Sequence, residues 1–355
     1  MSEAPAAWRA AALAPPPAHG PPPGRGVLKQ GADDFVVAER LGFAADGGVA
    51  HVLLRVEKRD RDTLAVAREL ARAAGGASRD VGFAGLKDRV AVATQWFTVP
   101  AGRAAPDWSG LAGPGFRVLE AGAHSRKLRR GALAGNTFRV VLREVVADPE
   151  RLGARLALVA GRGVPNYFGP QRFGRDGSNL DAVAQWLAGQ PLPRGREPRA
   201  FLLSAARSLL FNALLARRVA DGSWERLLPG EFVNLAGRLS WFAAEAIDAT
   251  LDERLARHDL HGTGPLAGRG PRPGGAAGAL EAAVQAEFGE LAVRLDAEGL
   301  EAARRPLRIV PQDFRTRSEP GSLTLEFGLP PGAYATAVLR ELLLTDALPT
   351  ETGDA

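Results

Sequence analysis

The chain has 355 residues, of which 46% are hydrophobic and 24% charged, and it carries a formal net charge of +5 without a single cysteine. This length predicts two domains, or one core with a large insertion, and no apolar run approaches the ~18 residues of a membrane span. The lack of cysteine excludes a disulfide framework, a thiolate nucleophile and a thiolate metal site.

The first part of the chain combines a proline-rich segment with a strand–helix–strand pattern. Residues 1–26 are rich in proline and lack the basic start and apolar stretch of a secretory signal, so they are predicted to be a disordered segment of a cytoplasmic protein. Apolar periodicity then predicts strands over 35–39, 52–56, 81–83 and 90–99 and a helix over 63–74. An irregular loop over 84–89 is predicted to join the last two strands.

The second part changes to longer helical patterns and returns to strands near its end. Strands are predicted over 137–143 and 323–329, helices over 202–219 and 335–344, and a glycine-, proline- and arginine-rich loop over 262–278. The simplest arrangement is a sheet domain interrupted by a helical insertion. The expected division is a core over 27–161 and 311–344, an insertion over 162–310 and a C-terminal tail over 345–355.

Basic residues gather most densely at one place in the chain. Nearly all of them are arginine, as a biased coding composition would give, so local clusters are more informative than the net charge. The densest cluster consists of Arg126, Lys127, Arg129 and Arg130. Such a cluster suits a polyanionic partner whose phosphates it would neutralise, although a solvated basic loop would give the same pattern.

Common metal and nucleotide motifs are missing from the sequence. His258 and His261 are three residues apart, but no convincing third ligand accompanies them, so they are interpreted as surface residues rather than a metal site. There is no Walker A pattern, no G-x-G-x-x-G after a strand and no G-x-S-x-G elbow. Kinase, dinucleotide-binding and serine-hydrolase functions therefore lose their main support.

Asp88 is the most suggestive candidate for catalysis. It lies between Lys87 and Arg89 in a loop that Gly85 introduces. An aspartate in a turn can simply cap backbone N–H groups, and that alternative stays open. Neighbouring cations, however, hold a carboxylate ionised, which a nucleophile or general base requires at neutral pH.

A longer set of motifs resembles a known family. The run Gly82–Arg89, followed by Thr94–Phe97, is similar to the catalytic motif of the TruD family of tRNA pseudouridine synthases. Five further motifs match in the family's order: Asp34–Glu39, Lys127–Phe138, Val164–Gly174, Leu203–Ser208 and Leu329–Thr336. The resemblance covers nearly all of 28–344, and it implies an α+β fold with a mixed, mainly antiparallel pseudouridine synthase sheet, flanking helices and a large helical α+β insertion.

The resemblance also implies a reaction and a set of roles. Members isomerise a specific uridine in RNA to pseudouridine, and bacterial members act on uridine 13 of glutamate tRNA. By the matching motifs, Asp88 would be the catalytic aspartate, and Phe35, Asn136 and Tyr334 would contact the target nucleotide or support the aspartate. Phe138 would lie beneath the base, or be an ordinary core phenylalanine. A basic partner of the aspartate is implied too, with Lys29 and Lys87 as the candidates.

The implied partners and alternatives follow from this chemistry. The reaction has no redox step and retains the uracil, so the resemblance implies tRNA as the partner and no cofactor, metal, membrane or obligate protein partner. Arg126, Lys127, Arg129 and Arg130 are expected to contact RNA phosphates, whereas Val164–Gly174 is expected to be structural, with Gln171 and Arg172 at the edge of the site. The competing hypotheses are a catalytically silent RNA-binding or chaperone protein and a nucleoside glycosidase that releases free uracil.

Overall fold

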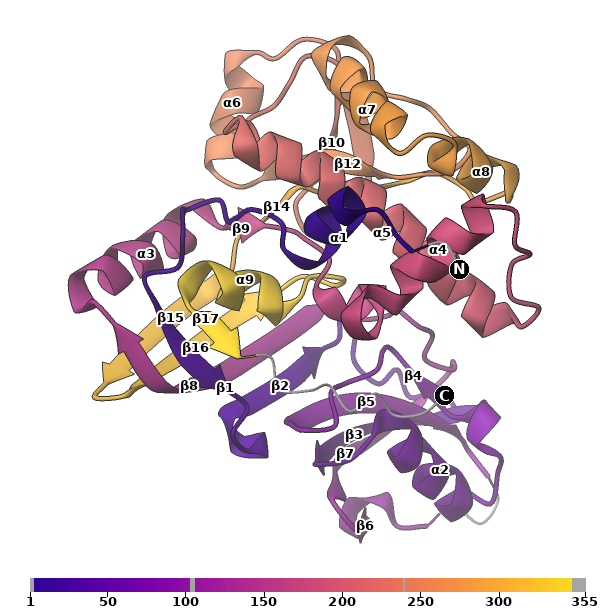
Figure 1. The fold of residues 1–355 in the computed structure, drawn as a ribbon. Helices are drawn as coiled ribbons and strands as arrows, with labels where there is room; N and C mark the ends of the chain where they lie inside the picture. Colours follow the sequence, from indigo (N-terminus) through magenta and orange to yellow (C-terminus); the bar gives the residue numbers. More distant parts are fainter. Residues whose placement is uncertain (1–2, 103–105, 239, 347–355) are drawn as a thin grey trace. The chain divides into compact units, whose positions relative to one another are not determined.

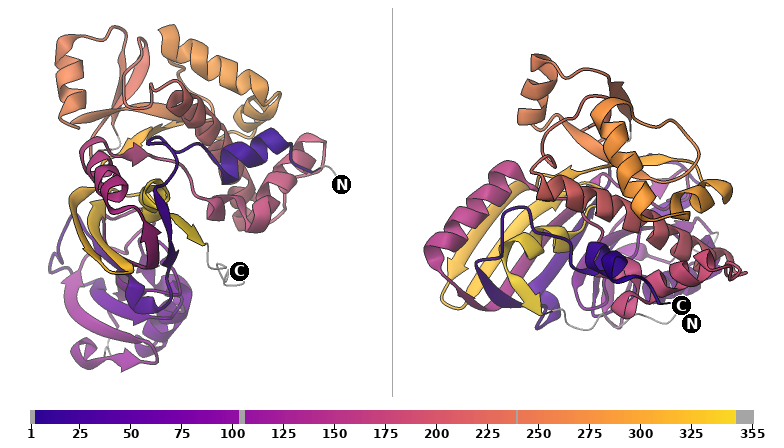
Figure 2. Two further views of the ribbon diagram at one scale, coloured as in Figure 1. Left: turned by 60° about the vertical axis from the view of Figure 1, so that its left-hand side comes forward. Right: turned by 45° about the horizontal axis from the view of Figure 1, so that its top comes forward.

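The structure is a computed structural model that describes residues 3–102, 106–238 and 240–346. Its internal contacts divide the chain into two compact units, which are shown in Figures 1 and 2 and described separately below. Unit 1 comprises Met1–Pro22, Gly153–Val310 and Tyr334–Leu342, and unit 2 comprises Pro23–Leu152, Pro311–Ala333 and Leu343–Ala355. Helix α3 (Pro149–Arg162) begins in unit 2 and continues in unit 1.

In the part of the chain that the structure describes, unit 2 is built on one large sheet of 11 strands, whose main path runs β15-β16-β8-β2-β5-β3-β7-β6. Neighbouring strands are antiparallel except for the pairs β2–β5 and β1–β17. The strands are β1 (Gly24–Leu28), β2 (Phe35–Arg40), β3 (His51–Arg59), β4 (Gly82–Phe83), β5 (Val92–Pro100), β6 (Ala112–Gly113), β7 (Phe116–His124), β8 (Gly135–Ala147), β15 (Gln312–Glu319), β16 (Ser322–Leu329) and β17 (Leu344–Asp346). This confirms the mixed, mainly antiparallel sheet.

Helix α2 (Thr63–Ala73) covers part of that sheet (Figure 1). Its apolar residues recur at helical spacing, and Val66 and Leu70 are fully buried against Leu54 of β3 and Phe97 of β5. The helix begins right after the residue Asp62 and ends before Gly75, whose φ of 68° is a backbone conformation that glycine adopts without strain. The core of this part of unit 2 therefore forms where the sequence pattern predicted a helix packed on strands.

Unit 1 is organised around helix α5 (Arg196–Ala220), which has 25 residues. Helices α1 (Ala6–Leu13) and α4 (Ser178–Leu187) contact α5, as do α7 (Gly275–Glu287) and α8 (Leu291–Ala297). The remaining elements are β9 (Val164–Pro165), β10 (Glu231–Leu235), β11 (Trp241–Ala244), α6 (Ala249–Ala256), β12 (Leu260–Leu266), β13 (Ala303–Pro306), β14 (Arg308–Ile309) and α9 (Ala335–Leu342). Within the described residues, α5 is the one helix long and apolar enough to cross a membrane, but 61% of its most apolar window is buried in this core.

The prediction that residues 1–26 are disordered is wrong for the residues that the structure describes. Helix α1 lies beside α5 in every view (Figures 1 and 2), and Trp8 is only 7% exposed, stacked on Phe288 with ring centroids 5.8 Å apart. The prolines that follow form no regular element, but two arginines donate hydrogen bonds to their carbonyls: the half-buried Arg340 to Pro15, and the buried Arg155 to Pro21. The packing of Trp8 and these hydrogen bonds therefore contribute to ordering a segment whose composition is typical of disorder.

Two smaller sequence expectations in unit 1 are also corrected. Most of the segment 262–278 is not a loop, because it contains the end of β12 and the start of α7. The strand needs a glycine at position 262 because a Cβ there would lie only 2.4 Å from Glu231 Oε1. His261 is not a surface residue either, since β12 buries it and this burial lowers its pKa to about 3.

The observed units differ from the expected division in two further segments. Contacts place residues 153–161 and Tyr334–Leu342 in unit 1, although both were assigned to the sheet core. Helix α9 joins unit 1 because the buried carboxylate of Glu341 accepts hydrogen bonds from Ala18 and His19 N–H, while Arg340 reaches Pro15. Most of the expected tail lies outside the described residues.

Candidate active site

The loop between β4 and β5 presents Asp88 to solvent in unit 2. The Asp88 side chain is 57% exposed, and its Oδ2 forms an ion pair with Lys29 Nζ, whose side chain is 18% exposed. The same ammonium lies 4.1 Å from the centroid of the Phe35 ring, within cation–π distance. Lys29 itself has a φ of 60°, which is uncommon for a residue with a side chain and typical of backbone strain retained at functional sites.

Lys87 is directed away from Asp88, although it is its neighbour in the sequence. Lys87 Nζ donates to Glu39 Oε1 at 2.5 Å, and Glu39 Oε2 accepts from the Trp96 N–H at 2.9 Å. The Glu39 side chain is completely buried, so its charge requires this cation. Of the two lysines that the sequence left as alternatives, the structure therefore brings Lys29 to Asp88 and places Lys87 in a buried ion pair.

Aromatic rings line the sheet next to this loop. Phe35 and Phe138 lie edge to face with centroids 6.0 Å apart, and Phe138 stacks on Phe327 at 5.4 Å. Phe35 is buried, whereas Phe138 is half-buried. Antiparallel pairing of β2 and β8 sets Asn136 opposite Glu39. Within the described part of the chain, the buried Asn136 Oδ1 has no hydrogen-bond partner, which is unusual for a buried acceptor.

Tyr334 belongs to unit 1 and is surrounded by residues of the segment Val164–Gly174. Its hydroxyl accepts a hydrogen bond of 2.6 Å from Arg172, and its ring lies 6.2 Å from Phe168. Arg305 stacks on the ring of Phe168, and its guanidinium carbon lies 4.1 Å from the centroid of that ring. Tyr167 and Phe173 are buried in the unit 1 core, which agrees with the structural role expected of this segment. The placement of Gln171 and Arg172 at the edge of the site stays a prediction.

The basic cluster adjoins the Asp88 loop within unit 2. Arg126 and Arg129 are exposed, Lys127 Nζ donates to the Arg79 carbonyl at 2.6 Å, and the Arg130 guanidinium lies 3.9 Å from the Phe83 ring. Two backbone contacts fix this segment: Leu128 N–H donates to Thr98 Oγ1, and Gly131 N–H to the Ala84 carbonyl. The basic cluster is therefore hydrogen-bonded to Thr98 and to Ala84, and Ala84 leads into the loop of Asp88.

Sequence reasoning missed three buried polar residues beneath the loop. Lys58, Thr63 and Gln95 are at most 2% exposed, and each forms a hydrogen bond to the backbone of the loop. A signal for one of them was available: Lys58 continues the i, i+2, i+4 alternation of Leu54 and Val56, so a lysine stands on the apolar face of a strand.

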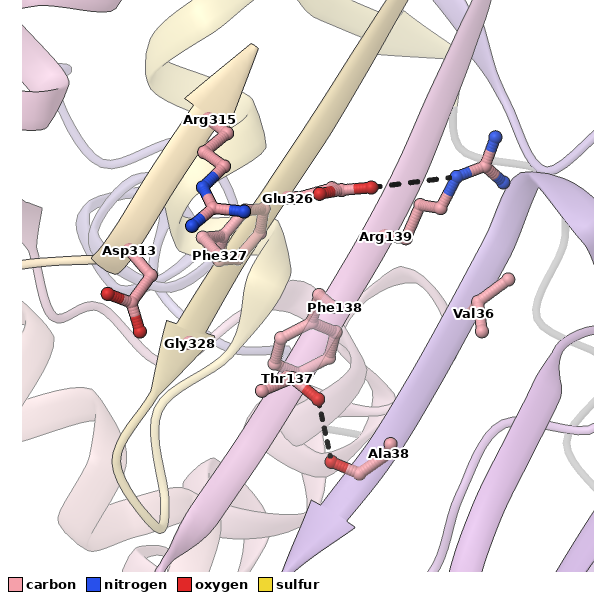
Figure 3. Close-up of a pocket in the computed structure, with 10 residues that line it drawn as sticks. All are labelled: Val36, Ala38, Thr137, Phe138, Arg139, Asp313, Arg315, Glu326, Phe327 and Gly328. Carbon is pink, nitrogen blue, oxygen red and sulfur yellow. Dashed lines mark hydrogen bonds and ion pairs between the residues drawn. The ribbon is translucent and has the colours of Figure 1, made fainter.

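A groove of about 340 Å³, which shares Phe138 and Phe327 with the aromatic rings above, lies over β2, β8, β15 and β16 (Figure 3). It is lined by Val36, Ala38, Thr137, Phe138, Arg139, Asp313, Arg315, Glu326, Phe327 and Gly328. Strand alternation directs Val36 and Ala38 to the face opposite Phe35 and Glu39. Its two arginines are matched by two carboxylates, with Arg139 3.9 Å from Glu326, so this groove lacks the charge excess that would attract a polyanion.

Comparisons with known proteins agree on one family. The family model of tRNA pseudouridine synthase D (TruD) matches residues 19–192 and 196–342. Among curated relatives, tRNA pseudouridine synthase D of Nitrosococcus oceani is 46% identical over 330 residues, covering 92% of each chain. That of Pseudomonas syringae pv. tomato is 44% identical and covers 96% of this chain and 97% of the relative.

The fold agrees with a solved structure as well. A crystal structure described as tRNA pseudouridine synthase D from Methanosarcina mazei superposes with a TM-score of 0.70, over 96% of this chain and 98% of that one, at 22% identity. At this identity the likeness shows the fold alone, whereas the family model and the curated relatives cover almost the whole sequence. The chain therefore belongs to the TruD family of tRNA pseudouridine synthases, isomerases that convert uridine in tRNA to pseudouridine.

Proposed function

We propose that Asp88 is the catalytic aspartate of this tRNA pseudouridine synthase and that the target is uridine 13 of glutamate tRNA. The observation that carries the proposal is the contact of Asp88 with Lys29 beside the Phe35 ring, in a loop that leaves more than half of the carboxylate exposed. The Lys29 ammonium holds the carboxylate in place by this ion pair, and the exposed side chain is accessible to a ribose. The choice of tRNA and position rests on the family resemblance alone.

The reaction needs only bond exchange within one nucleotide. The carboxylate either adds to ribose C1′ or removes a proton from C2′, and in both routes the C1′–N1 bond breaks. The detached uracil rotates and C5 bonds to C1′, which releases the carboxylate from C1′ in the first route and is accompanied by return of the proton from the carboxylic acid to C2′ in the second. C5 then loses its proton and N1 gains one, so the product has the same atoms as the substrate. Asp88 must be ionised in either route, and Lys29 supplies the countercharge that contacts it.

The neighbouring side chains suit an extruded base. A uridine inside a folded tRNA must leave its stack before its glycosidic bond is accessible, and aromatic rings and edge-reading polar groups then hold it. The half-buried Phe138 offers ring surface, and the buried Phe35 supports the Lys29 ammonium that contacts Asp88. The unpartnered oxygen of Asn136 suits the N3–H donor of uracil. Tyr334 is proposed to contact the same nucleotide, as its motif implies.

The basic cluster is proposed to hold the RNA backbone. Arg126 and Arg129 are exposed and lie in the segment fastened to the loop of Asp88. Phosphate contacts position an RNA without reading its sequence, so this cluster would orient the tRNA rather than select the uridine.

The test is pseudouridine formation in a glutamate tRNA transcript by wild type and Asp88→Asn, detected by carbodiimide-dependent primer extension. Asp107→Asn, a change at another exposed aspartate of unit 2, serves as the matched control. We expect a stop at position 13 with wild type and the control, none with Asp88→Asn, and no free uracil. Tight binding without a stop in any variant would favour an RNA-binding protein, and released uracil would favour a glycosidase.

A further inference from the structure

Lys58 is a buried lysine whose ammonium is occupied by main-chain carbonyls. The residue is 1% exposed, and its Nζ donates to the carbonyls of Arg61 and Asp88 at 2.6 Å each and to that of Lys87 at 3.4 Å. An ammonium has three N–H donors, so these three carbonyls use all of them. Two of the carbonyls belong to the loop of Asp88, and the third belongs to the turn that leads from β3 into α2.

Two further buried side chains hold the same loop. Gln95 Nε2 donates to the Gly85 carbonyl at 2.6 Å, and Thr63 Oγ1 accepts from the Lys87 N–H at 3.0 Å while donating to Gln95 Oε1 at 3.0 Å. Loop backbone between residues 85 and 88 is therefore bonded by side chains of β3, α2 and β5. Because the loop is irregular, these side chains replace the strand partners that its polar groups lack.

Burying an ammonium is costly, and the protein retains it at this position. Desolvation lowers the pKa of Lys58 to about 8, although the nearby carboxylates of Asp88 and Asp62 favour its charged form. The ammonium is still the main form at neutral pH. A neutral apolar residue would fill the same space at lower cost in solvation, but it would remove the donor that the Lys87 and Asp88 carbonyls share.

We propose that Lys58 is a positioning residue for catalysis: by bonding the Asp88 and Lys87 carbonyls it fixes the main chain from which the Asp88 carboxylate reaches the ribose. This rests on the proposed role of Asp88. Lys29 holds the carboxylate itself, whereas Lys58 holds the backbone and touches no reacting atom. A carboxylate displaced by about 1 Å loses on the order of 100-fold in rate, because reacting atoms must meet within a narrow range of distance.

The test compares Lys58→Met with Leu70→Ala, a control variant that is also expected to lower the stability of unit 2. Methionine keeps the length and removes the donors and the charge. Leu70→Ala removes buried apolar atoms of α2 in the same unit without a bond to the loop, so it destabilises the fold alone. Wild type, Asp88→Asn and both variants are assayed for single-turnover pseudouridine formation at saturating tRNA, for tRNA affinity and for thermal unfolding.

We expect Lys58→Met to lose about 100-fold in single-turnover rate while its tRNA affinity stays within about threefold of wild type. Leu70→Ala is expected to lower the unfolding temperature and keep the rate within about threefold. If Lys58→Met keeps the wild-type rate while Asp88→Asn is inactive, the positioning role is refuted and the catalytic role stands. An active Asp88→Asn would instead refute the catalytic role on which the proposal rests.

A second variant keeps the proposal testable if Lys58→Met does not fold. Thr63→Val is nearly isosteric and removes only the hydroxyl that bonds the Lys87 N–H and Gln95. We expect it to fold and to lose about tenfold in rate at unchanged tRNA affinity. A rate equal to that of wild type would show that the backbone of this loop needs no such support, and it would overturn the inference.

Discussion

Truncating Trp8 to alanine should destabilise unit 1 by about 3–5 kcal/mol, as large-to-small changes at buried aromatic sites do. The side chain is 7% exposed and stacks on Phe288. An aromatic side chain buries roughly 150–250 Å², which at about 25 cal/mol per Å² gives about 4–6 kcal/mol of hydrophobic stabilisation, in line with the mutational range. The neighbouring ion pair of Arg9 with Asp181, at 2.6 Å, remains in the variant and limits how far α1 separates from α5.

This loss is large enough to measure by thermal unfolding. For a unit of this size, each kcal/mol shifts the unfolding temperature by about 2–4 °C, so a decrease of about 6–20 °C is expected in calorimetry. Phe201→Ala is the matched control, because Phe201 is also an aromatic residue of unit 1 but is 61% exposed, and its change should stay below about 1 kcal/mol. Equal unfolding temperatures for Trp8→Ala and wild type would refute the reasoning that α1 is part of the unit 1 core.

Two further predictions concern acid stability and RNA binding. Burial holds the pKa of His261 at about 3, below its ordinary 6.5, so below pH 6.5 the histidine takes up a proton when the protein unfolds. The free energy of unfolding, measured in urea, should therefore decrease by about 2 kcal/mol from this group between pH 6.5 and 5, and His261→Gln should reduce that decrease. An unchanged pH dependence in the variant would contradict the assignment. Replacing Arg126 and Arg129 by alanine should weaken tRNA binding and reduce the slope of log K against log salt by about one per lost phosphate contact, whereas Arg72→Ala, an exposed arginine of the same unit, should leave the slope as it is.

The strands and the helix near Asp88 could be predicted because their patterns are local. Alternation of apolar and polar residues identified β3, β8 and β16, and helical spacing identified α2, since each element buries one face on the core. The irregular loop at 84–89 was identifiable by the glycine that introduces it, although the structure extends it to residue 91 because β5 begins at Val92. Asp88 stood out by its position in that loop and by the motif around it.

Other features depend on contacts that sequence periodicity does not record. Helix α1 is ordered by Phe288 and Asp181, residues far away in the chain, so composition alone suggested disorder. The glycines of β12 suggested a loop, whereas they are there because Glu231 and Phe211 approach the strand too closely for a side chain. In both cases tertiary packing outweighed the local composition.

The sequence by itself determined the family motifs, the large sheet and the candidate carboxylate of this protein. Only the tertiary structure decided which cation meets Asp88, because Lys29 lies 59 residues from it in the chain while the adjacent Lys87 reaches the buried Glu39, 48 residues away. It also decided that Lys58 is buried beneath the loop. A pattern of residues along a strand fixes the face on which a side chain stands, but the partner that a charge finds there depends on which distant segments the fold brings to that face.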